Sequence, residues 1–462
     1  MTYCLQSRWV LQGRTLVYYG LRNREHLFQN RIRLTRRQAA LVAGLPGPLD
    51  ARSLRQLKPL LGTCVVEEHR VRPVPRSLRE AVFCTDCCAN DFMIPGLEFD
   101  SRGRCPMCQT AEDTRHLRSL VPLVTDIPRS RHSRFDAALF YTGGKDSTYL
   151  LHHLVKVKGL RILALTWETP FMSDTAKQSI ANARQQFPTV EFRSRAVEPE
   201  AMKRIYRRLY ALSENTCACP SLAYVLFYPD LAAERVPYFL AGNEPAQMLG
   251  LYYNHMAPKL AYTFPDNRFL QGLVNLGRLA TLRPPLKRGQ FHTLATMKQL
   301  TGRSSRLQRW AGYSNELVDN IVAALQEAPQ LLEPLRRSLR RSSRTGQIPA
   351  FVHLDLDAIS GGAYDWRAVK DLLVRECGWV APPEDSRSLH TSCRIETCKE
   401  HTQFLRFYQC RSTMIPFSAL ELSLASRGRS LSRADVIREL EQNLGFSLTE
   451  VPACSIMREA LL

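Results

Sequence analysis

The sequence predicts an α/β protein whose centre is a parallel β-sheet, with smaller units before and after it. Between residues 135 and 241, short apolar runs alternate with amphipathic runs of helical period. This alternation is typical of parallel strands joined by crossover helices that cover both faces of a sheet. A Gly-Gly-Lys-Asp-Ser turn at residues 143–147 joins the first strand of the series to the first helix. Because ligands of such sheets lie at the carboxyl ends of the strands, we expect a binding site there.

Residues 1–76 predict a separate small α+β unit. Residue types alternate as in two or three short strands, followed by helical patterns at 35–45 and 50–61 and a last strand at 64–71. We expect a winged-helix-like recognition unit, which loosely resembles the peptide-recognition domains attached to enzymes that modify ribosomally made peptides. Winged helices also bind nucleic acid, and plain scaffolding is the third interpretation.

Residues 77–128 predict a zinc ribbon. The expected ligands form two Cys-x-x-Cys pairs, Cys84 with Cys87 and Cys105 with Cys108. Two such pairs can place four thiolates tetrahedrally around Zn²⁺. Four thiolates leave no open coordination position, so we expect a structural ion, with reactive free thiols as the alternative. Cys88, beside the first pair, is interpreted as a bystander.

Residues 129–262 predict the sheet domain. We expect strands at residues 135–141, 160–167, 190–196 and 237–241, and helices at residues 147–156, 174–186 and 199–212. Polar or aromatic residues stand where two of these strands end: Thr166 and Trp167, followed by Glu168, and then Gly242, Asn243 and Glu244. They should line one pocket together with the glycine turn, because the carboxyl ends of parallel strands share one edge of the sheet.

The turn itself has the chemistry of a phosphate site. Gly143 and Gly144 let the backbone approach an anion closely, and the helix that follows directs its N–H groups and dipole at the same place. Lys145 can neutralise phosphate charge, and Asp146 can bind Mg²⁺. Three hydroxyl side chains flank the turn: Thr142, Ser147 and Thr148. The spacing is not that of the Walker P-loop, and a glycine-rich turn without a ligand is the alternative.

Residues 263–462 predict a mainly helical C-terminal substrate region. The pattern at 265–345 is helical and basic, and residues 336–349 are expected to form an exposed link. Ser432 is expected to cap a helix that ends at residue 443. A second metal site could be suspected at His390, Cys393 and Cys398. Their spacing fits no established ligand pattern, so we expect them to serve packing.

Composition narrows the function classes. The formal net charge of +20 comes mostly from arginine. Such an excess fits nucleic acid, an acidic peptide or a polyanionic cofactor, and equally fits arginine spread over solvated faces. The chain has 14 cysteines, and its first residues do not form an apolar signal segment. We therefore expect these cysteines to lie in a reducing, cytoplasmic compartment. No stretch approaches the roughly 18 apolar residues of a membrane span, so we expect a soluble protein without a membrane partner.

The segment from Phe140 to Thr148 resembles the PP-loop of ATP pyrophosphatases, which read Ser-Gly-Gly-x-Asp-Ser at this turn. Thr142 replaces the serine and keeps its hydroxyl. The resemblance implies an adenine nucleotide α-hydrolase-like domain that binds ATP with Mg²⁺ and cleaves it between the α- and β-phosphates. AMP would remain on a substrate oxygen, while the loop N–H groups and Lys145 stabilise the departing pyrophosphate.

Over residues 84–445 the order of motifs resembles the N-acetyl sugar amidotransferases of bacterial surface-polysaccharide synthesis. The recurring signals are the four zinc cysteines with Phe-Asp-Ser-Arg-Gly at 99–103 between them, the loop at 142–148, the pair Cys217 and Cys219, and the stretch 379–396. The resemblance implies catalytic roles for Lys145, Asp146, Cys217 and Cys219. This chain has Cys-Ala-Cys where the family commonly has Cys-x-x-Cys, and Gly-Asn-Glu where the family has Gly-Glu-Asn.

The resemblance implies that ammonia, supplied by a separate glutaminase subunit, displaces AMP and gives an amide or amidine. The alternative is sulfur transfer with Cys217 or Cys219 as the persulfide carrier, similar to the PP-loop thiolases of tRNA and of small heterocycles. Two buried structural thiols are a further interpretation of this pair. Sugar, peptide and nucleobase acceptors, including RNA, remain open. A nucleic-acid-binding protein with a vestigial nucleotide fold is the non-enzymatic hypothesis, against which the intact turn argues.

Overall fold

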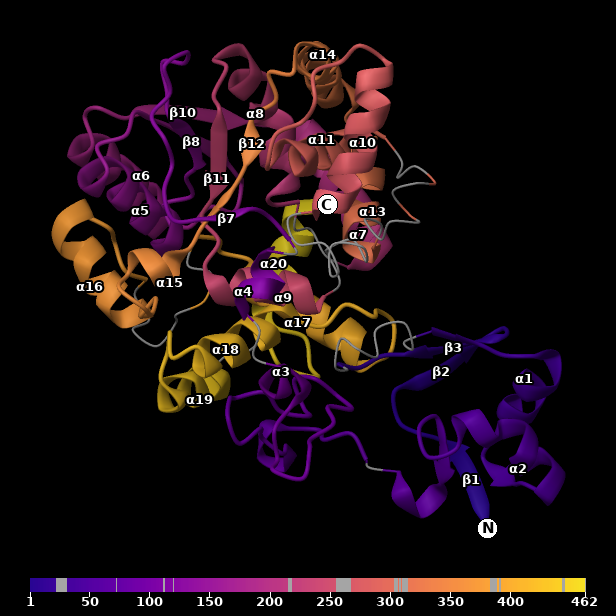
Figure 1. Cartoon of the computed structure of the whole chain (residues 1–462). Helices are drawn as coiled ribbons and strands as arrows, with labels where there is room; N and C mark the ends of the chain where they lie inside the picture. The colour runs from indigo at the N-terminus through magenta and orange to yellow at the C-terminus, as the bar shows by residue number, and fades with distance from the viewer. Residues whose placement is uncertain are drawn as a thin grey trace.

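A central sheet covered by helices forms the body of the protein, and the N-terminal unit lies at one end of it (Figure 1). The computed structural model describes residues 1–21, 31–71, 73–110, 113–118, 120–214, 218–254, 267–302, 306, 309, 315–382, 389, 392–442 and 445–461.

The central sheet has five parallel strands in the order β10-β9-β8-β11-β12. The strands are β8 (Ala137–Phe140), β9 (Ile162–Glu168), β10 (Glu191–Ala196), β11 (Tyr238–Ala241) and β12 (Ala350–Phe351). β8 comes first in sequence and lies in the middle, where all four of its residues are buried. The parallel sheet predicted from the sequence is confirmed. The strand order reverses between β8 and β11, which is the point at which open parallel sheets bind ligands.

Four helices lie between the strands from β8 to β11. They are α5 (Lys145–His152), which continues as a π-helical turn (His153–Val157), α6 (Asp174–Gln186), α7 (Pro199–Ser213) and α8 (Ser221–Ala233). The Ser173 hydroxyl caps α6 by accepting a 3.2 Å hydrogen bond from the Ala176 amide. α8 is absent from the sequence prediction because it is apolar around most of its circumference and gives no helical period. It packs against β9 on one side and α14 on the other.

Residues beyond β11 are mainly helical, as predicted. The helices are α9 (Pro245–Tyr253), α10 (Arg268–Ala280), α11 (Gln290–Leu300), α13 (Glu316–Leu325), α14 (Pro329–Thr345), α15 (Leu356–Ile359), α16 (Trp366–Cys377), α17 (Glu396–Tyr408), α18 (Phe417–Arg427), α19 (Arg433–Gln442) and α20 (Pro452–Leu461). The expected exposed link at 336–349 is wrong, because α14 runs to Thr345 and buries Leu335 and Leu339. The arginines of this helix lie on its solvent side. Their repeated charge makes the segment read as exposed in the sequence, although the opposite face of the helix is buried.

The N-terminal unit contains two antiparallel sheets and two helices. They are β5-β1-β6 (Gly47–Pro48, Thr2–Leu5 and Val65–Glu67), β2-β3-β4 (Trp9–Gln12, Thr15–Tyr18 and Arg31–Arg33), α1 (Arg36–Ala43) and α2 (Ala51–Leu57), with 3-10 turns at Lys58–Leu60 and Glu68–Arg70. The unit has its own core around Trp9, Leu16 and Tyr18. Strands and helices follow the expected order, while the winged-helix assignment stays a prediction.

Arg8 fixes this unit to the rest of the chain. Arg8 is 6 % exposed, and its guanidinium lies 5.0 Å from the centre of the Phe407 ring and donates to the Tyr408 carbonyl at 2.7 Å. Burial lowers the pKa of Arg8. Tyr408 also donates its hydroxyl hydrogen to the Pro75 carbonyl at 2.9 Å, so the end of α17 serves as the attachment point.

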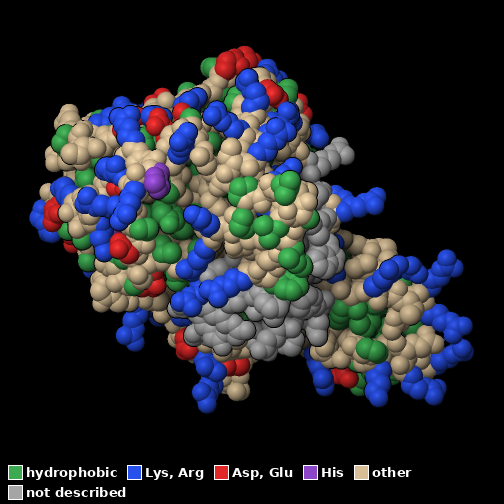
Figure 2. Space-filling view, turned by 45° about the horizontal axis from the view of Figure 1, so that its top comes forward, with side chains coloured by type: hydrophobic (Ala, Val, Ile, Leu, Met, Phe, Trp, Pro, Cys, Tyr) green, Lys and Arg blue, Asp and Glu red, His purple; other side chains and the backbone are tan. Residues whose placement is uncertain are grey.

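The remaining segments share one core. Residues 77–128 have little regular structure, namely a 3-10 turn at Leu78–Glu80, α3 (Pro106–Gln109), α4 (Asp113–Arg118) and β7 (Leu123–Val124), which pairs with β13 (His353–Leu354). A continuous set of buried apolar side chains runs from Cys84 through the sheet to Leu461. Lys and Arg side chains are spread across the face shown in Figure 2. Within the described part of the chain, no helix combines the length and apolar character that crossing a bilayer requires.

Candidate functional site

The turn between β8 and α5 is held by two glycines that admit no side chain. Gly143 has φ +71°, and a Cβ placed there would lie 2.5 Å from the carbonyl oxygen of Ala176. A Cβ on Gly242, after β11, would lie 2.7 Å from the backbone nitrogen of Ser147. The residue after β11 and the first turn of α5 therefore meet at backbone contact, and this contact lies at the reversal of strand order.

Hydroxyl groups brace the turn from inside. Thr142 Oγ1 and Ser147 Oγ lie 3.2 Å apart, and the Gly144 amide donates to Thr142 Oγ1 at 3.3 Å. Thr148 Oγ1 donates to the Gly144 carbonyl at 2.8 Å. Thr142 is exposed, whereas Ser147 and Thr148 are buried. Thr142 is thus the hydroxyl of this set that a ligand could reach, while the other two shape the loop.

The first turn of α5 points its backbone amides at this loop. Gly144 is the N-cap, in an extended conformation and without a side-chain cap, and the helix begins at Lys145. The amides of a helix's first turn have no carbonyl partner within the helix, and the helix dipole adds positive potential there. This arrangement fits an anion such as phosphate.

Lys145 is enclosed by aromatic rings from the C-terminal region. Its ammonium lies 4.6 Å from the centre of the Trp366 ring and 4.7 Å from that of Tyr364, and it forms an ion pair with Asp146. Only 5 % of the Lys145 side chain is exposed. Lys145 is therefore a buried residue. Its charge is held at the site by two rings and a carboxylate.

Asp146 stands at the same point and is more accessible, with 14 % of its side chain exposed. Tyr364 donates its hydroxyl hydrogen to Asp146 Oδ1 at 2.7 Å. Burial and the neighbouring Asp146 carboxylate raise the pKa of Tyr364, so the phenol remains a donor. A carboxylate oxygen at the loop supplies the hard ligand that Mg²⁺ prefers.

Glu244 completes a buried charge cluster. Its Oε1 caps α9 by accepting from the Gln247 amide at 2.9 Å, and its Oε2 lies 3.4 Å from the indole nitrogen of Trp366. Burial raises the pKa of Glu244 to about 8; Lys145 opposes this shift, and Asp146 adds to it. Glu244 therefore holds a proton through much of the neutral range.

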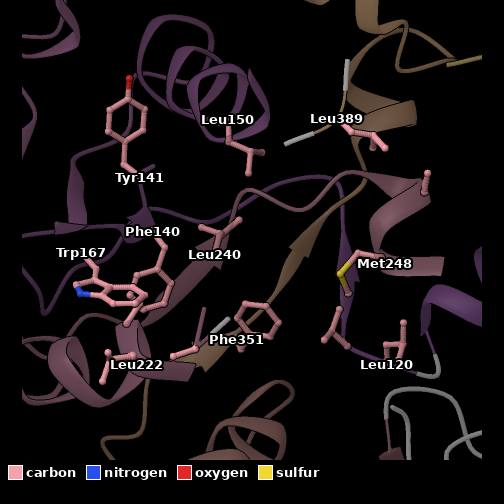
Figure 3. Close-up of a cluster of buried hydrophobic side chains, with 14 of the residues drawn as sticks. Leu120, Phe140, Tyr141, Leu150, Trp167, Leu222, Leu240, Met248, Phe351 and Leu389 are labelled. Carbon is pink, nitrogen blue, oxygen red and sulfur yellow. The ribbon is translucent and has the colours of Figure 1, made fainter. Parts of the chain in front are cut away.

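Three further predicted residues have packing or bracing roles. The Thr166 hydroxyl donates to the Tyr141 carbonyl at 2.9 Å and is buried. Trp167 packs beside Phe140 and Leu222 in the core (Figure 3). The Asn243 side-chain amide donates to Gln247 Oε1 at 3.4 Å. Thr166 and Trp167 support the loop from beneath, and Asn243 lies at its rim.

Several contacts at the site come from residues that the sequence analysis did not place there. Trp379 donates from its indole nitrogen to the Gly143 carbonyl at 3.0 Å. The Ser173 amide donates to the Ser392 carbonyl at 3.0 Å, which brings the 392–395 segment beside the start of α6. The stretch 379–396 had been noted as a motif without a role, whereas Tyr364 and Trp366 carry no local pattern that predicts a contact with the loop.

Cys217, the first residue of the predicted cysteine pair, lies outside the described residues. So does His390 of the suspected second metal site. Cys219 is exposed and precedes α8. Early in α8, the Tyr224 ring lies 5.3 Å from that of Phe140 at the carboxyl end of β8. At the far end of α8, the Glu234 carbonyl accepts from Ser133, which precedes β8. α8 therefore runs antiparallel to the strands, and Cys219 lies at the same edge of the sheet as the loop.

The four predicted metal ligands come together as a buried cluster. The sulfur atoms of Cys84, Cys87, Cys105 and Cys108 all lie within 4.8 Å of one another. Cys84 and Cys108 are 3.8 Å apart, and Cys87 and Cys105 are 3.7 Å apart. Zn–S bonds of about 2.3 Å in tetrahedral geometry place the sulfurs about 3.8 Å apart. The cluster thus fits a single tetrahedral ion, whereas a four-iron cluster binds each thiolate at a separate iron and needs wider spacing.

Arginines fix this cluster to the C-terminal helices. Arg433 donates to the carbonyls of Cys84, at 3.0 Å, and Cys87, and Arg427 donates to the Met107 carbonyl at 2.6 Å. Cys88 lies outside the four-sulfur group, with its thiol 3.3 Å from the Ser426 hydroxyl. These hydrogen bonds attach the cysteine segment to α18 and α19.

No protein-family model and no curated protein matches this sequence. Among solved structures, the chain is similar to the U34-tRNA thiolase NcsA from Methanococcus maripaludis, solved with its 4Fe-4S cluster. The sequence identity is 14 %, the match covers 56 % of this chain and 86 % of that chain, and the TM-score is 0.18. At this level the similarity assigns no activity, ligand or metal to this chain.

Proposed function

We propose that this protein is a PP-loop ATP pyrophosphatase that forms AMP while activating an oxygen of its acceptor. The observation that carries the proposal is the backbone contact of Gly242 with Ser147, which places the Gly143–Ser147 turn and the first turn of α5 at the reversal of strand order. Phosphates of ATP would lie against these amides.

The side chains divide the work of phosphate binding. The amides at the start of α5 receive the β- and γ-phosphates, and the Lys145 ammonium, 4.6 Å from the Trp366 ring, supplies positive charge beside them. Asp146 would hold Mg²⁺, which neutralises phosphate charge. In the structure Lys145 is paired with Asp146. Bound phosphate would compete with Asp146 for Lys145, and bound Mg²⁺ would compete with Lys145 for Asp146.

The proposed reaction begins with attack of an acceptor carbonyl or amide oxygen on the α-phosphorus. The bond to the bridging oxygen breaks, and pyrophosphate departs with the electron pair into the amide turn. The charge that develops on this leaving group is stabilised by fixed N–H donors, which act without rearrangement. A nucleophile then attacks the activated carbon, and AMP leaves.

Ammonia is the nucleophile implied by the resemblance to the amidotransferases, and it would come from a separate glutaminase. Sulfur transfer is the second candidate, and the observation that favours it is the exposed Cys219 at the loop edge of the sheet. A thiol there could carry a persulfide to the activated carbon. Both candidates require the same ATP half-reaction.

Nucleotide products test the proposal directly. ATP incubated with protein, Mg²⁺ and a cell-extract fraction containing the acceptor is expected to yield AMP and pyrophosphate, and ADP would overturn the reaction class. Asp146→Ala should abolish the product. Lys145→Ala should do so too and should also lower thermal stability, because Lys145 is buried beside two acidic side chains. Unchanged turnover in either variant would remove the site assignment.

The four-cysteine cluster is proposed as a structural zinc site. Its donor set matches structural zinc chemistry, and its contacts with Arg427 and Arg433 give it a scaffolding role.

A further inference from the structure

Helix α10 (Arg268–Ala280) directs several polar side chains at the protein, which is unusual for a helix at the surface. Its polar side chains face the protein: Gln271 donates to the Leu286 carbonyl at 2.8 Å, and Asn275 pairs with both backbone groups of Leu286, at 3.1 and 2.8 Å. Arg278 is 5 % exposed and donates to the carbonyls of Pro284 and Ser343. Leu270 is buried on the same side and Val274 partly so, whereas a surface helix normally buries its whole apolar stripe.

The outward side of α10 and the residues just after it are correspondingly apolar. Leu273, Leu276 and Leu279 follow one another at helical spacing and are 49 %, 68 % and 56 % exposed, and Leu282 is 98 % exposed. We call these four side chains the leucine face. Isolated exposed leucines are ordinary, but several in succession on one helix mark an interaction surface.

Charge around the leucine face has a single sign. Residues 268–289 contain no aspartate or glutamate, and besides the buried Arg278 they include four exposed cations: Arg268, Arg283, Lys287 and Arg288. Figure 2 shows hydrophobic side chains and Lys or Arg side chains gathered next to each other on this face. An apolar helix face flanked by cations is typical of helices that lie in a membrane interface.

A cavity of about 190 Å³ opens where α10 ends. It is lined by Arg283, Lys298, Leu339, Arg340, Ser343 and Arg344. None of its lining residues is acidic, and none of the four cations forms an ion pair with a described residue. Burial together with Arg283 and Arg278 lowers the pKa of Lys298, which reflects like charges held close together. We call this the cation pocket; an anion bound there would relieve the repulsion.

We propose that the leucine face and the cation pocket dock this protein on an anionic membrane surface. The leucines enter the boundary between headgroups and acyl chains, and lipid phosphates occupy the cation pocket. The expectation of no membrane partner rested on the lack of a spanning segment. An interfacial helix lies in the plane of the membrane and needs none.

Charge complementarity favours this occupant over the alternatives. A second copy of the chain on the same face would bring two groups of cations together without an intervening carboxylate. Nucleic acid would satisfy the cation pocket, but its phosphates gain nothing from exposed leucines. An amphipathic anionic surface satisfies both features at once.

Vesicle sedimentation of the full-length protein tests the proposal. We expect co-sedimentation with vesicles containing phosphatidylglycerol or phosphatidylserine, little with phosphatidylcholine alone, and loss of binding at high salt. Leu276→Gln and Leu279→Gln should each weaken binding about tenfold. Arg340→Gln and Arg344→Gln should each weaken it about fivefold. All four positions are exposed, and unchanged thermal melting would confirm folding.

Matched controls separate surface chemistry from location. Ile456→Gln removes an equally exposed apolar side chain on α20, and Arg36→Gln removes an exposed cation on α1; both should bind vesicles as the unmodified protein does. Absence of binding to anionic vesicles, or equal losses in the controls, would overturn the proposal. So would binding of an RNA oligonucleotide or an acidic peptide that the same variants abolish while vesicles are ignored. Concentration-dependent dimerisation lost in the leucine variants, without vesicle binding, would instead assign the face to a second copy.

Discussion

Tyr364 donates a 2.7 Å hydrogen bond to Asp146, although the two residues are 218 positions apart in the chain. The same segment supplies Trp366, which lies against Lys145 and reaches Glu244. The loop that follows β8 is thus completed by Tyr364, between α15 and α16, and by Trp366, the first residue of α16. Nucleotide chemistry in this protein should depend on the C-terminal region as well as on the sheet.

The first prediction concerns this hydrogen bond. Tyr364→Phe should lower the rate of AMP formation about tenfold, because a hydrogen bond to a charged group contributes about 1.5–3 kcal/mol. The aromatic face over Lys145 remains, so the loss of stability should not exceed that of the hydrogen bond itself. The matched control is Tyr149→Phe. The Tyr149 ring contacts the Tyr364 ring, and its hydroxyl lies 2.9 Å from the Ser360 hydroxyl. Equal effects in both variants would show that Tyr364 has only a packing role.

The second prediction follows from the raised pKa of Glu244. The carboxyl titrates near its ordinary value of 4.5 in the unfolded chain and at about 8 in the fold. The folded state therefore binds more protons between these values, and stability should fall as pH rises through this window. Glu244→Gln should flatten this part of the stability curve, because an amide stays neutral as the protonated acid does. Urea unfolding at pH 5 to 8 measures the difference.

Glu198→Gln is the control for the second prediction, since Glu198 also caps a helix, α7, and is exposed. It should leave the pH dependence of the unmodified protein in place. If Glu244→Gln shows the same slope as the unmodified protein, Glu244 is not the group responsible.

The third prediction tests the contact between Gly242, which follows β11, and Ser147 in the first turn of α5. Gly242→Ala adds a Cβ 2.7 Å from the Ser147 nitrogen and 2.8 Å from its Cα, so the start of α5 must move. We expect a loss of about 1–3 kcal/mol in stability and a larger relative loss of AMP formation, since displaced amides no longer match the phosphates. Gly272→Ala in α10, where nothing lies within 4 Å of the new Cβ, should be neutral or stabilising. Similar behaviour of both variants would show that the loop tolerates movement.

The sequence predicts the parts of this site that have a local signature. The Gly143–Ser147 turn and the four cysteines are recognised by spacing, and β8 to β11 by alternating apolar runs, because these features need only near neighbours in sequence. Tyr364, Trp366 and Trp379 could not be placed, because their contacts depend on how α16 packs against α5 and α6. The burial of Lys145 has the same origin. α8 was missed for another reason, since a helix buried on nearly all sides has no polar face to give it a period.

The fourth prediction concerns the four-cysteine cluster. Elemental analysis should find about one zinc ion per chain and no stoichiometric iron. Cys105→Ser should release the ion and destabilise the protein, because Arg433 and Arg427 attach α18 and α19 to this segment. Cys88→Ser, which alters a thiol outside the cluster, should retain zinc. Visible absorption from an iron–sulfur cluster, or full zinc content in Cys105→Ser, would contradict the assignment.

The last prediction separates nitrogen from sulfur transfer through Cys219. If ammonia displaces AMP, Cys219→Ser should keep ATP-dependent incorporation of ¹⁵N measurable, because ammonia itself forms the new bond and no protein thiol is consumed. If sulfur is transferred, a persulfide sulfur must attack the activated carbon, AMP must leave, and a second thiol must break the S–S bond. Cys217 is the candidate for that second thiol. Cys219→Ser should then remove the sulfur product almost completely while pyrophosphate release persists.

Cys410→Ser, which changes a half-buried thiol elsewhere, controls for general loss of a cysteine. A ³⁵S-labelled persulfide on Cys219 together with a labelled product would establish sulfur transfer. Product formation from ammonia at an undiminished rate in the Cys219 variant would exclude it, because the exposed position of this thiol is the structural argument for sulfur chemistry.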